Sequence, residues 1–159
     1  METVGAALLK GVDVEEVVEK LDSFYCYNMV VVQFCRAMEN RLEGQASFVL
    51  GDELEEVAEE ALRAAKRLSE RIGELGGEIT ADPSFWIERS PLPAFSMPES
   101  NSEVGVILEH VYERVRTIAR EYGDFLGRVK ERDELSHRLI LRLLAEQVAR
   151  ASELEAALA

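Results

Sequence analysis

Several motifs that mark common kinds of active site are absent from this sequence. It has no glycine-rich phosphate loop, no Cys-x-x-Cys pair and no His-Glu-x-x-His motif. Its two cysteines, Cys26 and Cys35, fall in one helical pattern, about 180° apart around the axis and roughly 13 Å apart along it. They therefore cannot form a disulfide with each other, and we expect structural thiols in a reducing compartment.

The sequence also lacks a long apolar run and an excess of basic charge. No segment approaches the roughly 18 apolar residues of a membrane span, and Met1 to Val12 lacks the pattern of a signal peptide. The 31 acidic residues outnumber the 18 basic ones, and the net charge of −13 opposes binding to nucleic acid or anionic lipid. We therefore expect a cytoplasmic protein. The scarcity of Asn and Gln is typical of a source that grows at high temperature.

The sequence does contain four long helical patterns, within a single domain that covers residues 1–159. Asp13 and Ser102 are placed to cap two of these helices, and Gly76-Gly77 is placed to end another. The expected helices span about residues 14–43, 52–75, 102–129 and 133–158.

Short links join the first two helices and the last two, so each pair is predicted to form an antiparallel hairpin. The connection between the pairs, about residues 78–101, is long enough to cross the whole bundle and contains all four prolines. We therefore predict an all-α four-helix bundle with one long crossover, with a short helix expected at Ser84–Arg89. Apolar residues in the crossover should pack on the bundle or on a neighbouring subunit: Phe85, Trp86, Ile87, Phe95 and Met97.

One asparagine interrupts the apolar face of the first helix. Asn28 lies in register with Leu21 and Cys35, seven residues away on either side, so it should point into the core. A buried amide needs hydrogen-bond partners, so this position predicts a polar group at the bundle centre.

Taken together, these features resemble the ferritin-like superfamily, and within it the Dps-like branch, with bacterioferritin as a relative. The matching stretches are Gly11 to Leu21, Arg71 to Gly77, Asp82-Pro83 and Met97 to Glu99, in the expected order and spacing. The resemblance implies a ferritin-like bundle with a single crossover between its second and third helices.

The resemblance also implies where a metal centre would lie. Members usually bind two irons, using a carboxylate from each of two helices and a Glu-x-x-His pair from each of the others. The two carboxylate positions fall here on Asn28 and Val111, and the pair of the second helix falls on Ala61 and Ala64.

The pair of the fourth helix falls on Glu146 and Ala149, or on Gln147 and Arg150 after a shift of one residue. Helical phase favours Gln147 facing inward, with Glu146 near the rim. The chain's two histidines lie elsewhere, at His110 and His137. We interpret the sequence as a ferritin-like protein without its di-iron centre, and with no catalytic, cofactor-binding or metal-binding residue.

An iron site remains the alternative. In a different register, four carboxylates would gather as ligands: Glu39, Glu60, Glu109 and Glu146. Helical phase places Glu109 away from the apolar face, and Glu39 lies near a helix end where it can reach solvent.

Three functions follow as hypotheses. The first is a non-catalytic assembly protein that forms a homo-oligomer or cage, or co-assembles with an active paralogue. The second is an iron-storage protein that oxidises Fe(II) at an atypical site, and the third is a helical adaptor that binds another protein. For the first, we expect Asn28 and Gln147 to hydrogen-bond at the centre, directly or through a water, with Tyr25 or Tyr27 as a further partner.

Overall fold

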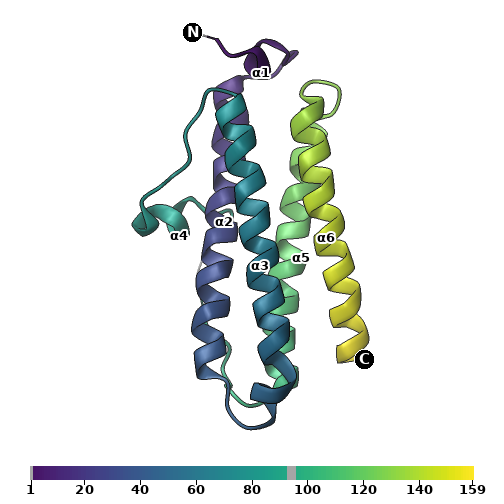
Figure 1. Cartoon of the computed structure of the whole chain (residues 1–159). Coiled ribbons are helices and arrows are strands. Elements are labelled where there is room, and N and C mark those ends of the chain that lie inside the picture. The colour runs from purple at the N-terminus through teal and green to yellow at the C-terminus, as the bar shows by residue number, and fades with distance from the viewer. Residues whose placement is uncertain (1, 93–95) are drawn as a thin grey trace.

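The computed structural model describes residues 2–92 and 96–159, and in these residues it contains helices and no strand. The four long helices form a bundle in which α2 and α3 make one antiparallel hairpin and α5 and α6 make the other (Figure 1). A long crossover returns the chain from the end of α3 to the opposite end of the bundle, so that α5 runs parallel to α3. The predicted topology is confirmed. The elements are α1 Val4–Ala7, α2 Val14–Arg41, α3 Gln45–Glu74, η1 Pro83–Phe85, α4 Trp86–Arg89, α5 Val104–Val129 and α6 Glu134–Leu158.

The first hairpin begins as the sequence predicts, but its second helix starts earlier. Asp13 caps α2 by accepting a hydrogen bond from the Glu15 amide. The expected start of α3 near Asp52 is wrong, because α3 begins at Gln45 and runs through Gly51. Glycine inside a helix costs only about 1 kcal/mol. The apolar stripe of α3 extends to Ala46 and Leu50, which are buried and offset that cost.

The caps of the second hairpin differ from the expectation. Asp133, expected as the first residue of its helix, instead caps α6 by accepting a hydrogen bond from the amide of Ser136. Ser102 does not cap α5, because the helix starts later, at Val104. Ser100 instead accepts hydrogen bonds from the amides of Ser102 and Glu103.

The core consists of two apolar clusters, one toward each end of the bundle. Phe24, Tyr122 and Phe125 pack edge to face in the first cluster, with ring centroids 4.8 and 5.6 Å from Phe24. The second cluster gathers around Met38 and Ile107. Asn28 and Arg150 are buried where the two clusters meet. Arg71, Asp133 and Ser136 are buried together at the end of the bundle where α3 ends and α6 begins.

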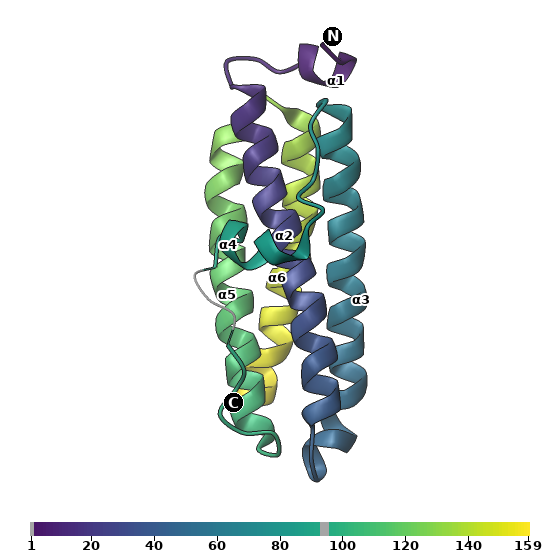
Figure 2. The same cartoon turned by 90° about the vertical axis from the view of Figure 1, so that its left-hand side faces the viewer.

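The crossover is anchored on α2. Asp22 accepts hydrogen bonds from the amide and hydroxyl of Thr80, at 2.8 and 2.6 Å, while Arg89 and Trp86 bond to the same threonine. The expected helix at Ser84–Arg89 is present as η1 and α4, which lie against the outer side of α2 (Figure 2).

The apolar residues of the crossover have different surroundings. Phe85 and Ile87 are 41% and 49% exposed, as the sequence suggested for a surface that meets another subunit. Met97 instead packs against the second core cluster, so part of the crossover covers its own bundle. Phe95 lies outside the described residues.

Helix α1 was not predicted from the sequence. It lies across the end of the bundle where α3 ends (Figure 2). Thr3 caps α1 and donates a hydrogen bond to the carbonyl of Glu74. Gly5 approaches that same carbonyl so closely that a Cβ atom would lie 2.5 Å from its oxygen, which explains why glycine is required there.

None of the helices in the described part of the chain has both the length and the apolar character needed to cross a membrane.

Candidate functional site at the bundle centre

A small polar cavity lies between the two core clusters. The volume open to the centres of water molecules is about 40 Å³, enough for a few waters. Side chains from all four long helices line it. They include most positions to which the ferritin resemblance assigns a relic ligand: Asn28, Ala61, Ala64, Val111 and Gln147. Ala149, the other position suggested for the fourth helix, is exposed and does not line the cavity.

Asn28 is buried at the α2 side of the cavity, as its register predicts. Its Nδ2 donates hydrogen bonds of 2.8 Å to the carbonyl of Phe24 and 3.1 Å to the hydroxyl of Tyr122. Gln147 lines the same cavity but shares no hydrogen bond with Asn28 among the described contacts. No direct bond joins Asn28 to Gln147, Tyr25 or Tyr27 among the described contacts, and Tyr122 is its side-chain partner. A bridge to Gln147 through a water stays a prediction.

Arg150 enters the cavity from α6 and is the most buried charged residue there, with only 5% of its side chain exposed. Its two terminal nitrogens bind two carboxylates of α3, at 2.7 Å for Glu53 and 2.9 Å for Glu60. Glu53 and Glu60 are seven residues apart, so they lie on one face of α3, and the guanidinium joins both at once.

Glu146 completes the charged side of the cavity. It lies 3.7 Å from both Arg67 and Arg142, and it is 28% exposed. The sequence suggested two registers for α6, with either Glu146 or Gln147 at the centre. Both side chains line the cavity and both are half-buried, so one does not exclude the other.

Burial changes the proton affinity of the groups around the cavity. Burial raises the pKa of Glu60, and Glu146 raises it further, although Arg150 partly offsets both. Burial raises the pKa of Tyr122 and Tyr27 well above the usual range of a phenol, and raises that of Cys35 to about 12. At neutral pH the two phenols and the thiol are therefore neutral hydrogen-bonding groups, and not anionic metal ligands.

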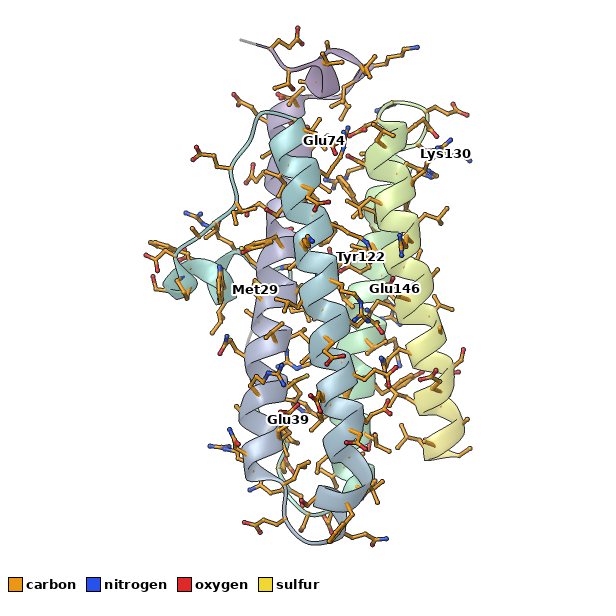
Figure 3. All side chains as sticks on the ribbon, in the orientation of Figure 1. Met29, Glu39, Glu74, Tyr122, Lys130 and Glu146 are labelled. Carbon is orange, nitrogen blue, oxygen red and sulfur yellow. The ribbon has the colours of Figure 1, made fainter. Side chains whose placement is uncertain are left out.

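The four carboxylates of the alternative iron site do not gather. Glu60 and Glu146 line the cavity, but Glu39 pairs with Arg36 on the outside of α2, and Glu109 is exposed. Figure 3 shows Glu39 far down α2 from the level of Tyr122 and Glu146. The two histidines do not lie among the residues that line the cavity.

The donor set at the centre does not fit two iron ions. Di-iron sites of this family use four carboxylates and two imidazoles. Here Ala61, Ala64 and Val111 form apolar wall, and Glu60 is already bound by Arg150. Among the described residues, no cluster of three or more His, Cys, Asp or Glu is placed to hold a metal ion.

Two residues of this site were not recognised from the sequence. Tyr122 appeared only as one member of the apolar stripe of its helix, although its hydroxyl is the one polar group there that reaches Asn28. Arg150 appeared only as an alternative position for a ligand. The available signal was a charged residue between Ala149 and Ala151, on a helix whose inner face is otherwise uncharged.

The comparisons agree with this fold. The ferritin-like domain model matches residues 11–159, and no curated protein sequence matches the chain. The bacterioferritin-related dodecameric thioferritin of Bacteroides fragilis superposes with a TM-score of 0.85 at 22% identity, over 94% of this chain and 89% of that one.

Two Dps structures are similar to the same extent. For Dps from Staphylococcus aureus the TM-score is 0.82 at 17% identity, over 91% of this chain and 96% of the other. For Dps from Vibrio cholerae O1 it is 0.82 at 18% identity, over 92% and 91%. Because the domain match spans nearly the whole sequence and the bundle has the same fold as these structures, the chain belongs to the ferritin-like family.

Proposed function

We propose that this protein is a ferritin-like assembly subunit that does not oxidise iron at its bundle centre. The observation that carries the proposal is the apolar wall formed by Ala61, Ala64 and Val111, all buried around the cavity. Methyl groups offer a metal ion no ligand, and hard cations need oxygen or imidazole donors. On this proposal, the bundle serves as a scaffold for assembly and not as an iron-oxidising centre.

Self-association is supported by the outer face of α2 and α3. Tyr25, Met29 and Leu62 line a groove there, and Leu62 is 51% exposed. Figure 3 shows Met29 on the opposite side of the bundle from Glu146. An apolar groove on a charged helix face is typical of a surface that another protein covers.

Charge order along α3 points to a second copy of the chain as the occupant. Close to Leu62 the exposed charged residues change sign along α3, and acidic residues return at Glu70. The turns before Leu62 carry Glu55 and Glu59, and the turn after it carries Arg63 and Lys66. None of these four forms an ion pair within the described chain. Antiparallel packing of two α3 helices around Leu62 would place each acidic segment against a basic one.

Assembly can take a homo-oligomeric form, up to a cage, or co-assembly with an iron-oxidising paralogue. Cys26 and Cys35 are buried free thiols, which supports a reducing, cytoplasmic setting.

The test is aerobic addition of Fe(II) to protein freed of metal, with ferric absorbance followed against a protein-free control and a ferritin that has an intact centre. We expect the rate of the protein-free control, together with a light-scattering mass above that of the 17.8 kDa monomer. Faster oxidation would overturn the non-catalytic assignment. A monomeric mass at micromolar concentration would instead favour an adaptor.

A further inference from the structure

We propose that Arg150 is a built-in cation that keeps divalent metal ions out of the bundle centre. In this role its guanidinium neutralises carboxylates that would otherwise be available as metal ligands. The inference rests on the proposed function and adds a second obstacle to metal binding beside the apolar wall.

The geometry of Arg150 is that of a fixed internal charge. Its side chain is 5% exposed, and its two terminal nitrogens are each within 3 Å of a carboxylate oxygen, at 2.7 Å for Glu53 and 2.9 Å for Glu60. Arg67 and Arg142 approach Glu146 only to 3.7 Å and are more exposed. Arg150 is therefore the one cation of this group that is held inside the bundle by short bonds.

Of the two carboxylates that Arg150 holds, Glu60 lines the central cavity and Glu53 lies beyond its lining. Glu60 and Glu146 line the cavity with the amide of Gln147, and Glu53 reaches the same guanidinium. Each of these groups is a suitable ligand for Mn²⁺ or Co²⁺ once it is not paired. A divalent ion entering now would lose Glu60 to Arg150 and would face a buried positive charge beside it.

Glu60 depends on Arg150 to remain charged inside the bundle. Glu60 is largely removed from solvent, so its charge is costly unless a cation lies beside it, and Arg150 supplies that cation at 2.9 Å. Loss of the arginine charge should therefore lead either to protonation or to capture of a cation from solution. A purely structural cross-link would predict only the loss of stability.

The test uses the full chain, freed of metal, with Co²⁺ as the probe. Arg150→Met removes the charge and keeps a long side chain, whereas Arg150→Lys keeps the charge. Arg142→Met is the matched control, because Arg142 also pairs with a cavity glutamate but its side chain is 60% exposed. Binding is read by titration calorimetry and by the visible absorption of protein-bound Co²⁺.

We expect Arg150→Met to bind about one Co²⁺ per chain and to gain thermal stability with Co²⁺, because the carboxylates of Glu53 and Glu60 lose their cation. The wild type, Arg150→Lys and Arg142→Met should show neither effect. Adding Glu60→Gln to Arg150→Met should abolish the binding. A folded Arg150→Met that binds no more Co²⁺ than the wild type would overturn the proposal, as would wild-type binding that Glu60→Gln removes.

If Arg150→Met does not fold, the same titration is made on Glu53→Gln/Arg150→Met, which leaves one fewer unpaired carboxylate. Failure of that variant to bind Co²⁺, or to refold in its presence, also counts against Arg150. Iron oxidation by the wild type would overturn the proposed function instead, so the two failures are distinguishable.

Discussion

The side-chain nitrogen of Asn28 donates a hydrogen bond of 3.1 Å to the hydroxyl of Tyr122, a residue 94 positions further along the chain. Asn28 lies on α2 and Tyr122 on α5, so this bond joins the two hairpins through the middle of the bundle. Both residues are almost completely buried. The polar centre inferred from Asn28 is present, and its partner is a phenol.

Replacing Asn28 should reveal this partnership. Asn28→Leu is expected to cost about 1–3 kcal/mol, because it leaves the buried hydroxyl of Tyr122 without its donor. Combined with Tyr122→Phe, the loss should be smaller than the sum of the single losses, since the two side chains interact directly. Asn28→Leu and Gln147→Leu should be additive. Thermal and urea unfolding of the two double-mutant cycles measures both, and coupling with Gln147 alone would contradict the observed hydrogen bond.

The proposed contact between two α3 helices around Leu62 can be tested by exchanging charges. Glu59→Lys and Lys66→Glu should each weaken self-association, because each places like charges opposite one another in the antiparallel pairing. The double exchange should restore it, since the side chains at positions 59 and 66 would again be opposite in charge. Sedimentation velocity over a range of protein concentrations measures the effect. Lys130→Glu, on the turn between α5 and α6 (Figure 3), is the matched control and should change nothing. If the double exchange is as weak as the single ones, the pairing is wrong.

A second buried arginine, Arg71, should contribute strongly to stability at the end of the bundle where α3 ends and α6 begins. Arg71 on α3 binds Asp133 at 2.8 Å and Ser136 at 3.0 Å, and the other oxygen of Asp133 already has no partner among the described residues. Arg71→Met should therefore cost about 3–5 kcal/mol, because it leaves a buried carboxylate uncompensated.

Two further variants separate charge from packing at this site. Arg71→Met/Asp133→Asn should cost less than Arg71→Met, because Asn removes the stranded charge and still caps α6. Arg67→Met breaks a longer, partly exposed pair and should cost less than about 1 kcal/mol. Chemical denaturation measures the free energy of unfolding of all three variants. Equal losses for Arg67→Met and Arg71→Met would show that burial does not determine the size of the loss.

The buried thiols predict how stability depends on pH. Burial raises the pKa of Cys26 from 9.0 to about 11 and that of Cys35 from 9.0 to about 12. The unfolded thiols ionise near 9 while the folded ones stay neutral, so stability is complete below pH 9 and falls as the pH rises toward 11 or 12. Each thiol contributes at most roughly 1.4 kcal/mol per pH unit in this range.

The melting temperature between pH 8 and pH 11 measures this loss. Cys26→Ala/Cys35→Ala should flatten the curve, although ionisation of unfolded tyrosines leaves a residual slope because burial also raises the pKa of Tyr27 and Tyr122. At pH 8 the native thiols should react with a disulfide reagent only as fast as the protein opens. Rapid labelling of the folded protein would contradict their burial.

Much of the fold could be predicted from periodicity because a helix repeats its inner face at a fixed angle. That rule placed Asn28 and Ala61 correctly, and the capping preferences placed Asp13. It failed at the start of α3, which was expected near Asp52, because the buried face of the helix already begins at Ala46 and Leu50.

The contents of the centre were less predictable for a different reason. Helical phase gives the direction of a side chain from its own axis, but not the neighbour that it meets. Gln147 does reach the cavity, yet Asn28 bonds to Tyr122 across the bundle. Arg150 is long enough to carry its charge to Glu53 and Glu60 on another helix, so its role depends on the distance between helices, which one sequence does not contain.

The polar links between α3 and α6 have a consequence for the order of folding. Each hairpin is local in sequence, with a short turn between its helices, whereas Arg71 and Asp133 are 62 residues apart and Arg150 and Glu60 are 90 apart. Local contacts form early and distant ones late. The hairpins should therefore form first and close on one another through a seam of opposite charges, so added salt should slow the closing step more than the formation of either hairpin.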